Sequence, residues 1–249
     1  MVAAVEKKAT RHETPCGDGH MVWRRWGSGP PVVLIHGGSG AWSHWIRNIE
    51  ALSARHTVWA IDLPGCGESA LPDQLTVEAL VDIVERGLLQ LIPGSEPVDL
   101  VAFSFGSPTA IMLAVRLKHR IRNLILLGAR FARYSPRLKL NMMKWRTIAD
   151  PIERAEAHRH NLAQLMIDDP KKIDALAVYL QSTNAPRTRI SARKWTPGPS
   201  DKLHEYFPQV VARRVIVAFG SRDMGAANII ENGGTDLRSD QPGVKLQVF

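Results

Sequence analysis

Cysteine is scarce in this chain, and hydrophobic runs of membrane-spanning length are missing. Cys16 and Cys66 are the only cysteines in 249 residues, which excludes a disulfide framework and favours a reducing compartment, so we expect a cytoplasmic protein. Their wide separation argues against a paired metal site. The absence of long apolar runs predicts no transmembrane segment. Residues 1–15 lack the apolar core of a secretory signal and are expected to form a flexible leader.

The net charge of +8 is concentrated in one segment. Residues 130–194 contain 14 Lys and Arg against 6 Asp and Glu, so the rest of the chain is balanced. Aromatic residues are few in this segment and follow no stacking pattern, which argues against a nucleic-acid partner. We expect a solvated helical surface. The alternative is a surface that attracts an anionic substrate or an anionic membrane.

Short β-branched runs alternate with helical patterns along most of the chain. This alternation predicts an α/β fold in which a mostly parallel sheet is connected by crossover helices. The expected strands are His20–Trp26, Val32–His36, Thr57–Asp62, Val98–Phe103, Asn123–Gly128, Val215–Gly220 and Val244–Phe249. The expected helices are Trp42–Ala54, Val77–Leu91, Phe105–His119, Asp201–Ala212 and part of Ala226–Arg238.

The segment 131–199 differs because it predicts helices with no intervening strand. They are expected at Pro136–Ile148, Pro151–Ile167 and Lys171–Leu180. An insertion of helices between two sheet strands is typical of a lid over the carboxyl ends of the strands. We therefore expect a core formed by residues 16–130 and 200–249, with a helical cap formed by residues 131–199.

A glycine-rich turn follows the buried strand Val32–His36. The residues Gly37-Gly38-Ser39-Gly40 allow the backbone to approach a ligand closely. Such turns also occur in dinucleotide sites. Here Ser43 occupies the place of the third glycine of that motif, and Asp62 runs directly into a Pro-Gly turn. Dinucleotide binding is therefore disfavoured.

A serine stands between a predicted strand and a predicted helix, in the run Val101-Ala102-Phe103-Ser104-Phe105-Gly106. This is the position of a nucleophile, and small flanking residues relieve steric clash in such a turn. With the His-Gly-Gly turn and the run Asp62-Leu63-Pro64-Gly65-Cys66-Gly67-Glu68-Ser69, the chain resembles the α/β-hydrolase superfamily, specifically its cap-bearing members with a serine nucleophile. The resemblance extends from about residue 20 to residue 249. Ala102 replaces the first glycine of the family's G-x-S-x-G motif.

The resemblance implies roles for individual residues. Ser104 would be the nucleophile, and the backbone N–H groups of Phe105 and Gly38 would form the oxyanion hole. Asp223, in a Gly-x-x-Asp turn after a strand, would be the catalytic carboxylate. His36 and Asp62 would stabilise turns and take no part in catalysis. Substrate-binding residues are not indicated by the resemblance.

The family's catalytic histidine has no counterpart after Asp223. None of the 26 residues from Met224 to Phe249 is histidine, and the family places this base just beyond a strand like Val244–Phe249. The expected explanation is a chain that ends before the catalytic histidine. His158 and His160 lie in the cap, but neighbours two residues apart face different sides of a helix, so at most one could reach the site.

Together these features predict an esterase-like serine hydrolase that forms an acyl-enzyme on Ser104. Esters, lactones and diketones cleaved at a C–C bond suit this chemistry, and the basic cap favours an anionic small-molecule substrate. The alternative is a member of the same fold that binds a small ligand without catalysis, which the missing base would suit. Neither a metal nor an organic cofactor is required. The oligomeric state is left open.

Overall fold

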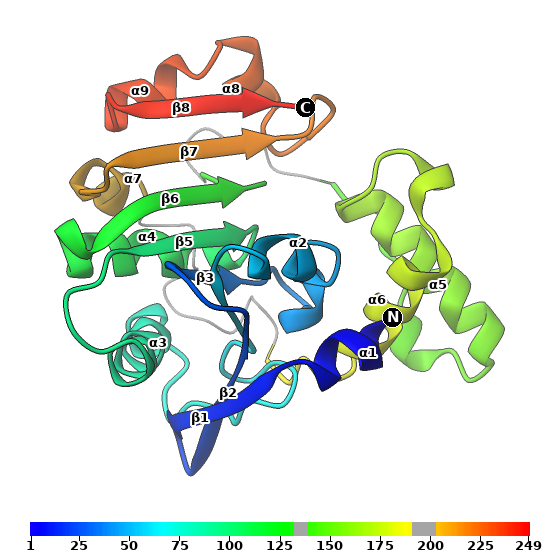
Figure 1. The fold of residues 1–249 in the computed structure, drawn as a ribbon. Helices are drawn as coiled ribbons and strands as arrows, with labels where there is room; N and C mark the ends of the chain where they lie inside the picture. Colours follow the sequence, from blue (N-terminus) through cyan, green and yellow to red (C-terminus); the bar gives the residue numbers. More distant parts are fainter. Residues whose placement is uncertain (132–138, 191–202) are drawn as a thin grey trace.

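The computed structural model describes residues 1–131, 139–190 and 203–249. Within these ranges the strands form one eight-stranded sheet of order β1-β2-β4-β3-β5-β6-β7-β8 (Figure 1). They are β1 Thr10–Cys16, β2 Gly19–Trp26, β3 Pro31–Ile35, β4 Thr57–Ile61, β5 Val98–Phe103, β6 Ile121–Leu127, β7 Arg214–Phe219 and β8 Val244–Val248. Strand β2 is antiparallel to β1 and β4, and all other neighbours are parallel. The predicted fold class is confirmed.

Strand β3 shows why both faces of the sheet are covered. All five of its residues are buried, and successive side chains point to opposite faces. Val33 and Ile35 pack in one hydrophobic cluster, and Val32 and Leu34 pack in the other. The first cluster is covered by α3 Val77–Leu91, α4 Gly106–Leu117, α7 Leu203–Tyr206, α8 Ala227–Glu231 and α9 Thr235–Asp240. The second is covered by α1 Val2–Lys7, the 3₁₀ turn η1 Trp42–Trp45 and α2 Ile49–Ser53.

The flexible leader expected for residues 1–15 is not what the structure shows. Residues 2–7 form α1, and strand β1 pairs with β2 along its whole length. The indole of Trp26 donates a hydrogen bond to the carbonyl of Val5 at 2.8 Å. This strand could not be recognised from the sequence, because β1 is an edge strand and most of its side chains are at least partly exposed. It therefore lacks the apolar alternation that identifies a strand.

The described part of the cap contains two longer helices, α5 Pro151–Leu165 and α6 Ala175–Asn184. Both begin at an aspartate: the carboxylate of Asp150 accepts from the N–H groups of Ile152 and Glu153, and that of Asp174 accepts from Ala177. Short 3₁₀ turns, η3 Trp145–Thr147 and η4 Pro170–Lys172, precede the two helices. Figure 1 shows the cap beyond the carboxyl ends of the parallel strands.

The prediction of a helix at Pro136–Ile148 is wrong for residues 139–148, the part of it that the structure describes. Residues 139–144 have no regular structure, and only η3 follows. The side-chain amide of Asn161 accepts from the Met143 N–H at 2.8 Å and donates to its carbonyl at 3.0 Å. These bonds take the place of helical backbone bonds. A tertiary contact therefore overrides the local helical pattern. Residues 136–138 lie outside the described residues.

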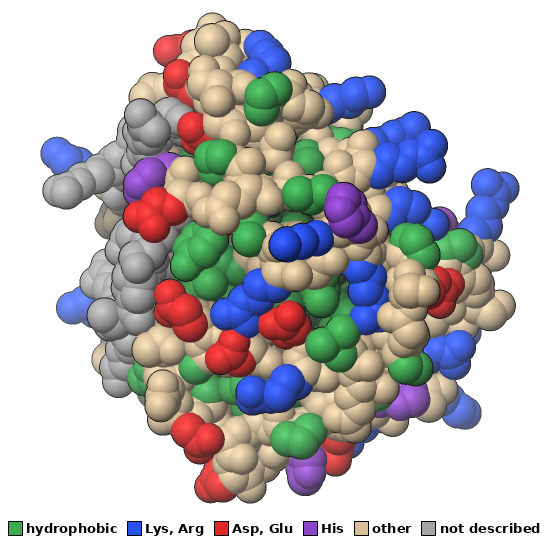
Figure 2. All heavy atoms as spheres, turned by 90° about the vertical axis from the view of Figure 1, so that its left-hand side faces the viewer, with side chains coloured by type: hydrophobic (Ala, Val, Ile, Leu, Met, Phe, Trp, Pro, Cys, Tyr) green, Lys and Arg blue, Asp and Glu red, His purple; other side chains and the backbone are tan. Residues whose placement is uncertain are grey.

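The face of the molecule away from the cap carries charges of both signs. Figure 2 shows Lys and Arg side chains there interspersed with Asp, Glu and hydrophobic side chains. This agrees with the balanced composition outside residues 130–194. Among the helices in the described ranges, none combines the length and the hydrophobicity needed to cross a lipid bilayer.

Candidate active site

Ser104 occupies a tight turn between β5 and α4. Its φ of 48° lies in the left-handed region that side chains other than glycine rarely adopt. The Ser104 N–H donates to the carbonyl of Leu127 at 2.8 Å, and the Ser104 carbonyl accepts from Ser107 at 3.0 Å. Outliers of this kind are concentrated at functional sites. The backbone thus holds Ser104 in the conformation expected of a nucleophile's turn.

The small residue at position 106 is required by its surroundings. A Cβ at Gly106 would lie 2.7 Å from the carbonyl oxygen of His36 and 2.8 Å from Cγ2 of Ile35. Helix α4 can therefore begin close against the end of β3 only with glycine here. The close packing brings the serine turn next to the His-Gly-Gly turn.

Asp223 lies in the turn after β7, where its N–H donates to the Gly220 carbonyl at 3.0 Å. One carboxylate oxygen accepts from the Gly225 N–H at 2.9 Å. Ser104 and Asp223 line the same cavity, whose volume is about 300 Å³. The structure therefore brings together the nucleophile and the carboxylate predicted from sequence. Their catalytic roles remain predictions.

The two predicted oxyanion donors also lie next to each other. Gly38 is exposed in the turn after β3, and a Cβ placed on it would lie 3.7 Å from Cβ of Phe105. The following residue, Ser39, has a φ of 54°, which turns the chain sharply. Among the described residues none accepts a hydrogen bond from the Gly38 N–H. That amide is therefore available to a ligand.

His36 is buried and both of its ring nitrogens contact backbone atoms. The Leu63 N–H donates to Nε2 at 3.0 Å, so Nδ1 carries the proton and donates to the Gly37 carbonyl at 2.7 Å. Burial lowers the pKa of His36, against the opposing effects of the Gly37 carbonyl and Asp62. The neutral ring therefore links the turns after β3 and β4, as the sequence predicted.

Asp62 also stabilises turns, because its carboxylate accepts hydrogen bonds from their backbone N–H groups. One carboxylate oxygen accepts from the Trp42 N–H at 2.8 Å, and the other accepts from the Glu68 N–H at 3.1 Å. The second oxygen also contacts the guanidinium of Arg24 at 3.3 Å. Asp62 is 1% exposed. These contacts match the structural role predicted for it.

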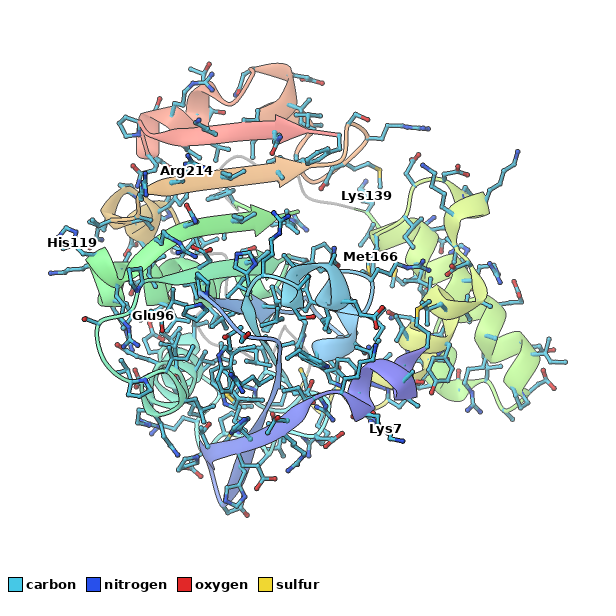
Figure 3. The ribbon with its side chains drawn as sticks, in the orientation of Figure 1. Lys7, Glu96, His119, Lys139, Met166 and Arg214 are labelled. Atoms are coloured by element: carbon cyan, nitrogen blue, oxygen red, sulfur yellow. The ribbon has the colours of Figure 1, made fainter. Side chains whose placement is uncertain are left out.

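A second cavity of about 250 Å³ lies between the cap and the core. It shares Phe103, Leu127 and Met166 with the cavity at Ser104, and Figure 3 shows Met166 between the core and the cap. Most of the other lining side chains are apolar, and they include Ile46, Leu162, Ile167, Ala177 and Leu180. The two cavities therefore adjoin, and the second offers an apolar compartment beside the nucleophile.

His44 lines the apolar cavity and was not identified from the sequence. Burial, followed by the proximity of His36, lowers its pKa to about 3. The ring is therefore neutral at ordinary pH. The signal that could have found it is its place in η1, directly after the glycine-rich turn, where a polar side chain can face the site.

No described histidine lines the cavity that contains Ser104 and Asp223. The buried ring of His158 stacks on Trp145 with centroids 4.8 Å apart, and Nε2 of His160 lies 2.6 Å from the Asn141 carbonyl. Neither cap histidine is therefore placed to act on the Ser104 hydroxyl. Phe249 does line this cavity.

Comparison with known proteins gives a family and a set of relatives. The family model described as alpha/beta hydrolase fold matches residues 30–211. The chain is 38% identical over 108 residues to a 2-hydroxy-6-oxo-2,4-heptadienoate hydrolase from Pseudomonas putida. It is 33% identical over 101 residues to a pimeloyl-[acyl-carrier protein] methyl ester esterase from Aeromonas hydrophila. Each match covers 41% of this chain and 38% of the relative.

Solved structures resemble the chain over nearly its whole length. An esterase from a Rhodococcus species superimposes with a TM-score of 0.74 and 22% identity, covering 96% of this chain and 90% of that one. The thioesterase domain from the curacin biosynthetic pathway gives a TM-score of 0.69 at 16% identity, covering 97% and 92%. At these identities the likeness concerns the fold alone.

Proposed function

The chain belongs to the α/β-hydrolase fold family, and we propose that it is a hydrolase of small molecules acting through an acyl-enzyme on Ser104. The observation that carries this proposal is the shared cavity: a serine in a left-handed turn and the carboxylate of Asp223 line one 300 Å³ space. The exposed Gly38 amide adjoins the serine turn. A nucleophile, a carboxylate and an oxyanion donor are three of the parts that acyl transfer uses.

In the proposed reaction the Ser104 oxygen attacks the substrate's carbonyl carbon, and the carbonyl π electrons move onto the oxygen. The N–H groups of Gly38 and Phe105 would donate to this oxyanion, and each such donor is typically worth about 3 kcal/mol in the transition state. The tetrahedral intermediate collapses, the leaving group departs with the proton that the Ser104 hydroxyl has lost, and an acyl ester remains on Ser104. Water then attacks that ester and releases the acid.

The proton on the Ser104 hydroxyl needs an acceptor, because the neutral hydroxyl is a weak nucleophile. In a triad, a carboxylate such as Asp223 orients an imidazole that takes this proton. No described histidine lines this cavity. We therefore expect slow acylation of Ser104, because no described imidazole in this cavity takes the proton from its hydroxyl.

The apolar cavity, the basic segment and the names of the relatives support a substrate class. The apolar cavity suits a hydrocarbon group, while the excess of Lys and Arg in residues 130–194 favours an anionic group. One relative is named for a dienoate and the other for a methyl ester. We propose an ester, a lactone or a diketone cleaved at a C–C bond, in which a carboxylate accompanies an apolar group.

The test is covalent labelling of Ser104 together with ester hydrolysis. A fluorophosphonate probe and a short-chain aryl ester are applied to the chain and to the variants Ser104→Ala and Ser107→Ala. We expect Ser104→Ala to lose both labelling and turnover. Ser107→Ala is the matched control, because Ser107 is a buried neighbour in α4 whose hydroxyl has no described partner. Equal labelling of all three proteins would overturn the assignment of Ser104.

A second candidate function is ligand binding without catalysis. The observation that favours it is the lack of a described histidine in the Ser104 cavity, next to an apolar cavity of about 250 Å³. A protein of this kind would bind a small ester and release it unchanged. Saturable binding with no Ser104-dependent product would support this candidate over the hydrolase.

A further inference from the structure

The ring of His44 is held against the backbone of Gly40. A Cβ at Gly40 would lie 2.3 Å from Cε1, 2.5 Å from Nδ1 and 2.8 Å from Nε2 of His44. Any side chain at position 40 would therefore displace the imidazole. Phe103 contacts the ring from another side in a T-shaped arrangement, with centroids 6.0 Å apart. The position of His44 is thus set by a glycine and by the residue that precedes the nucleophile.

The two ring nitrogens of His44 have different surroundings. Nδ1 is shielded from solvent and has no hydrogen-bond partner among the described residues. A buried N–H without an acceptor is a rarer defect than an unpaired acceptor, so we place the proton of the neutral ring on Nε2. The Nε2–H group is then the donor that His44 can offer to a ligand.

His44 is one of the polar side chains that line the apolar cavity adjoining Phe103, and it lies against Phe103 itself. Of the other lining residues with polar atoms, Arg47 is engaged with Asp174 at 2.5 Å. Asn48, Gln181 and the indole N–H of Trp45, which has no described partner, complete the set. The volume of about 250 Å³ exceeds the roughly 150 Å³ of a protein cavity that binds benzene. A ring or a short branched chain therefore fits beside the histidine.

We propose that His44 selects substrates whose apolar group carries a hydrogen-bond acceptor, such as a ketone or ether oxygen, apart from the carbonyl that Ser104 attacks. The inference rests on the proposed function only in taking Ser104 as the reacting residue. A donor set beside apolar side chains discriminates because an acceptor placed against those side chains would remain unpaired. His44 thereby determines specificity, while Ser104 and the oxyanion donors perform the chemistry.

The experiment measures binding without turnover, in the Ser104→Ala background. Acetophenone and ethylbenzene share a ring and a two-carbon chain and differ in one carbonyl oxygen. Their dissociation constants are measured by calorimetry with His44 present and with His44→Phe added. We expect His44→Phe to weaken acetophenone about 3- to 10-fold, the range of one net hydrogen bond, and to change ethylbenzene less than about twofold.

Two further variants check the result: one displaces the His44 ring by a different substitution, and the other serves as the control. Gly40→Ala, which displaces the ring without removing it, is expected to give the same selective loss as His44→Phe. His119→Phe is the matched control, because His119 is exposed on the far side of the core from the cap (Figure 3), and it should leave both constants unchanged.

The outcomes separate the inference from the proposed function. Selective loss of acetophenone binding supports the role of His44 even if Ser104 fails to label with fluorophosphonate. Equal weakening of both ligands, no weakening, or no measurable binding of either ligand overturns the inference, and labelling of Ser104 would still stand in each case.

Discussion

At the scale of single residues, the geometry of the site depends on two glycines, because a Cβ at either position would clash with a neighbouring residue. Gly106 lets α4 pack against the end of β3, and Gly40 makes room for the ring of His44. Both glycines accommodate a close contact without needing a positive φ. Their effect is to bring the serine turn, the amide of Gly38 and the imidazole to one edge of the sheet.

The change Gly106→Ala tests the packing of the serine turn. The new Cβ would lie 2.7 Å from a backbone oxygen of His36, so the two turns must move apart. We expect a loss of about 1–3 kcal/mol in the free energy of unfolding and a fall in Ser104 labelling. Urea denaturation and probe labelling measure the two effects. Gly243→Ala is the control, since no atom lies within 4 Å of its Cβ position; equal behaviour of the two variants would contradict this account.

At the scale of elements, Arg24 joins α1, β2 and the turn after β4. Its guanidinium is 2% exposed and contacts Glu6 at 2.7 Å, Glu68 at 2.5 Å and Asp62 at 3.3 Å. It also lies over the ring of Trp42, 5.0 Å from the centroid. A buried cation with three carboxylate partners explains how residues far apart in the sequence hold the amino-terminal helix on the sheet.

The change Arg24→Met tests this network. Methionine keeps most of the volume but leaves the buried carboxylate of Asp62 without its cation, and breaking such a pair costs about 3–5 kcal/mol. We expect the midpoint of urea unfolding to fall accordingly. The double variant Arg24→Met/Asp62→Asn should recover part of the loss, because the uncompensated charge is gone. An unchanged midpoint for the single variant would show that the network contributes little.

At the scale of the whole molecule, several histidines are held neutral by the fold. Burial lowers the pKa of His36, His44, His158 and His12 below the ordinary value, to about 3 for His44. The unfolded chain binds protons at these side chains below about pH 6.5, while the folded chain does not. Stability is therefore complete above that pH and decreases as the pH falls toward the lowered values.

His158 offers a test of this pH dependence that avoids the proposed site. Both of its ring nitrogens are shielded and have no described partner, so a proton there would place an unpaired charge in the cap. We expect the free energy of unfolding to drop between pH 7.5 and pH 5.0, and to drop less in His158→Phe. Urea titrations at both pH values, with His119→Phe as the control, measure the difference. Equal drops in all three proteins would contradict the assignment.

Elements in the core of the fold were predicted more accurately from the sequence than the edge strand β1 and the segment 136–148. Strand β5 and helix α3 were predicted with the bounds that the structure shows, because each buries a clear apolar pattern. Strand β1 was missed because most of its side chains are at least partly exposed, and the described part of the helix at 136–148 was wrong because Asn161 bonds to the backbone of Met143. The division between core and cap remains a prediction at residue 199, which lies outside the described residues.

The sequence by itself determined the features that depend on neighbours along the chain: the apolar run of β3, the small residue after the serine turn and the glycine-rich turn after His36. Short-range sterics and side-chain periodicity are sufficient for these. Only the tertiary structure decided that Ser104 and Asp223 share a cavity, that His44 packs on Gly40 beside an apolar compartment, and that Arg24 anchors α1. These relations depend on contacts between separate strands and turns, whose distances no local pattern of residues records.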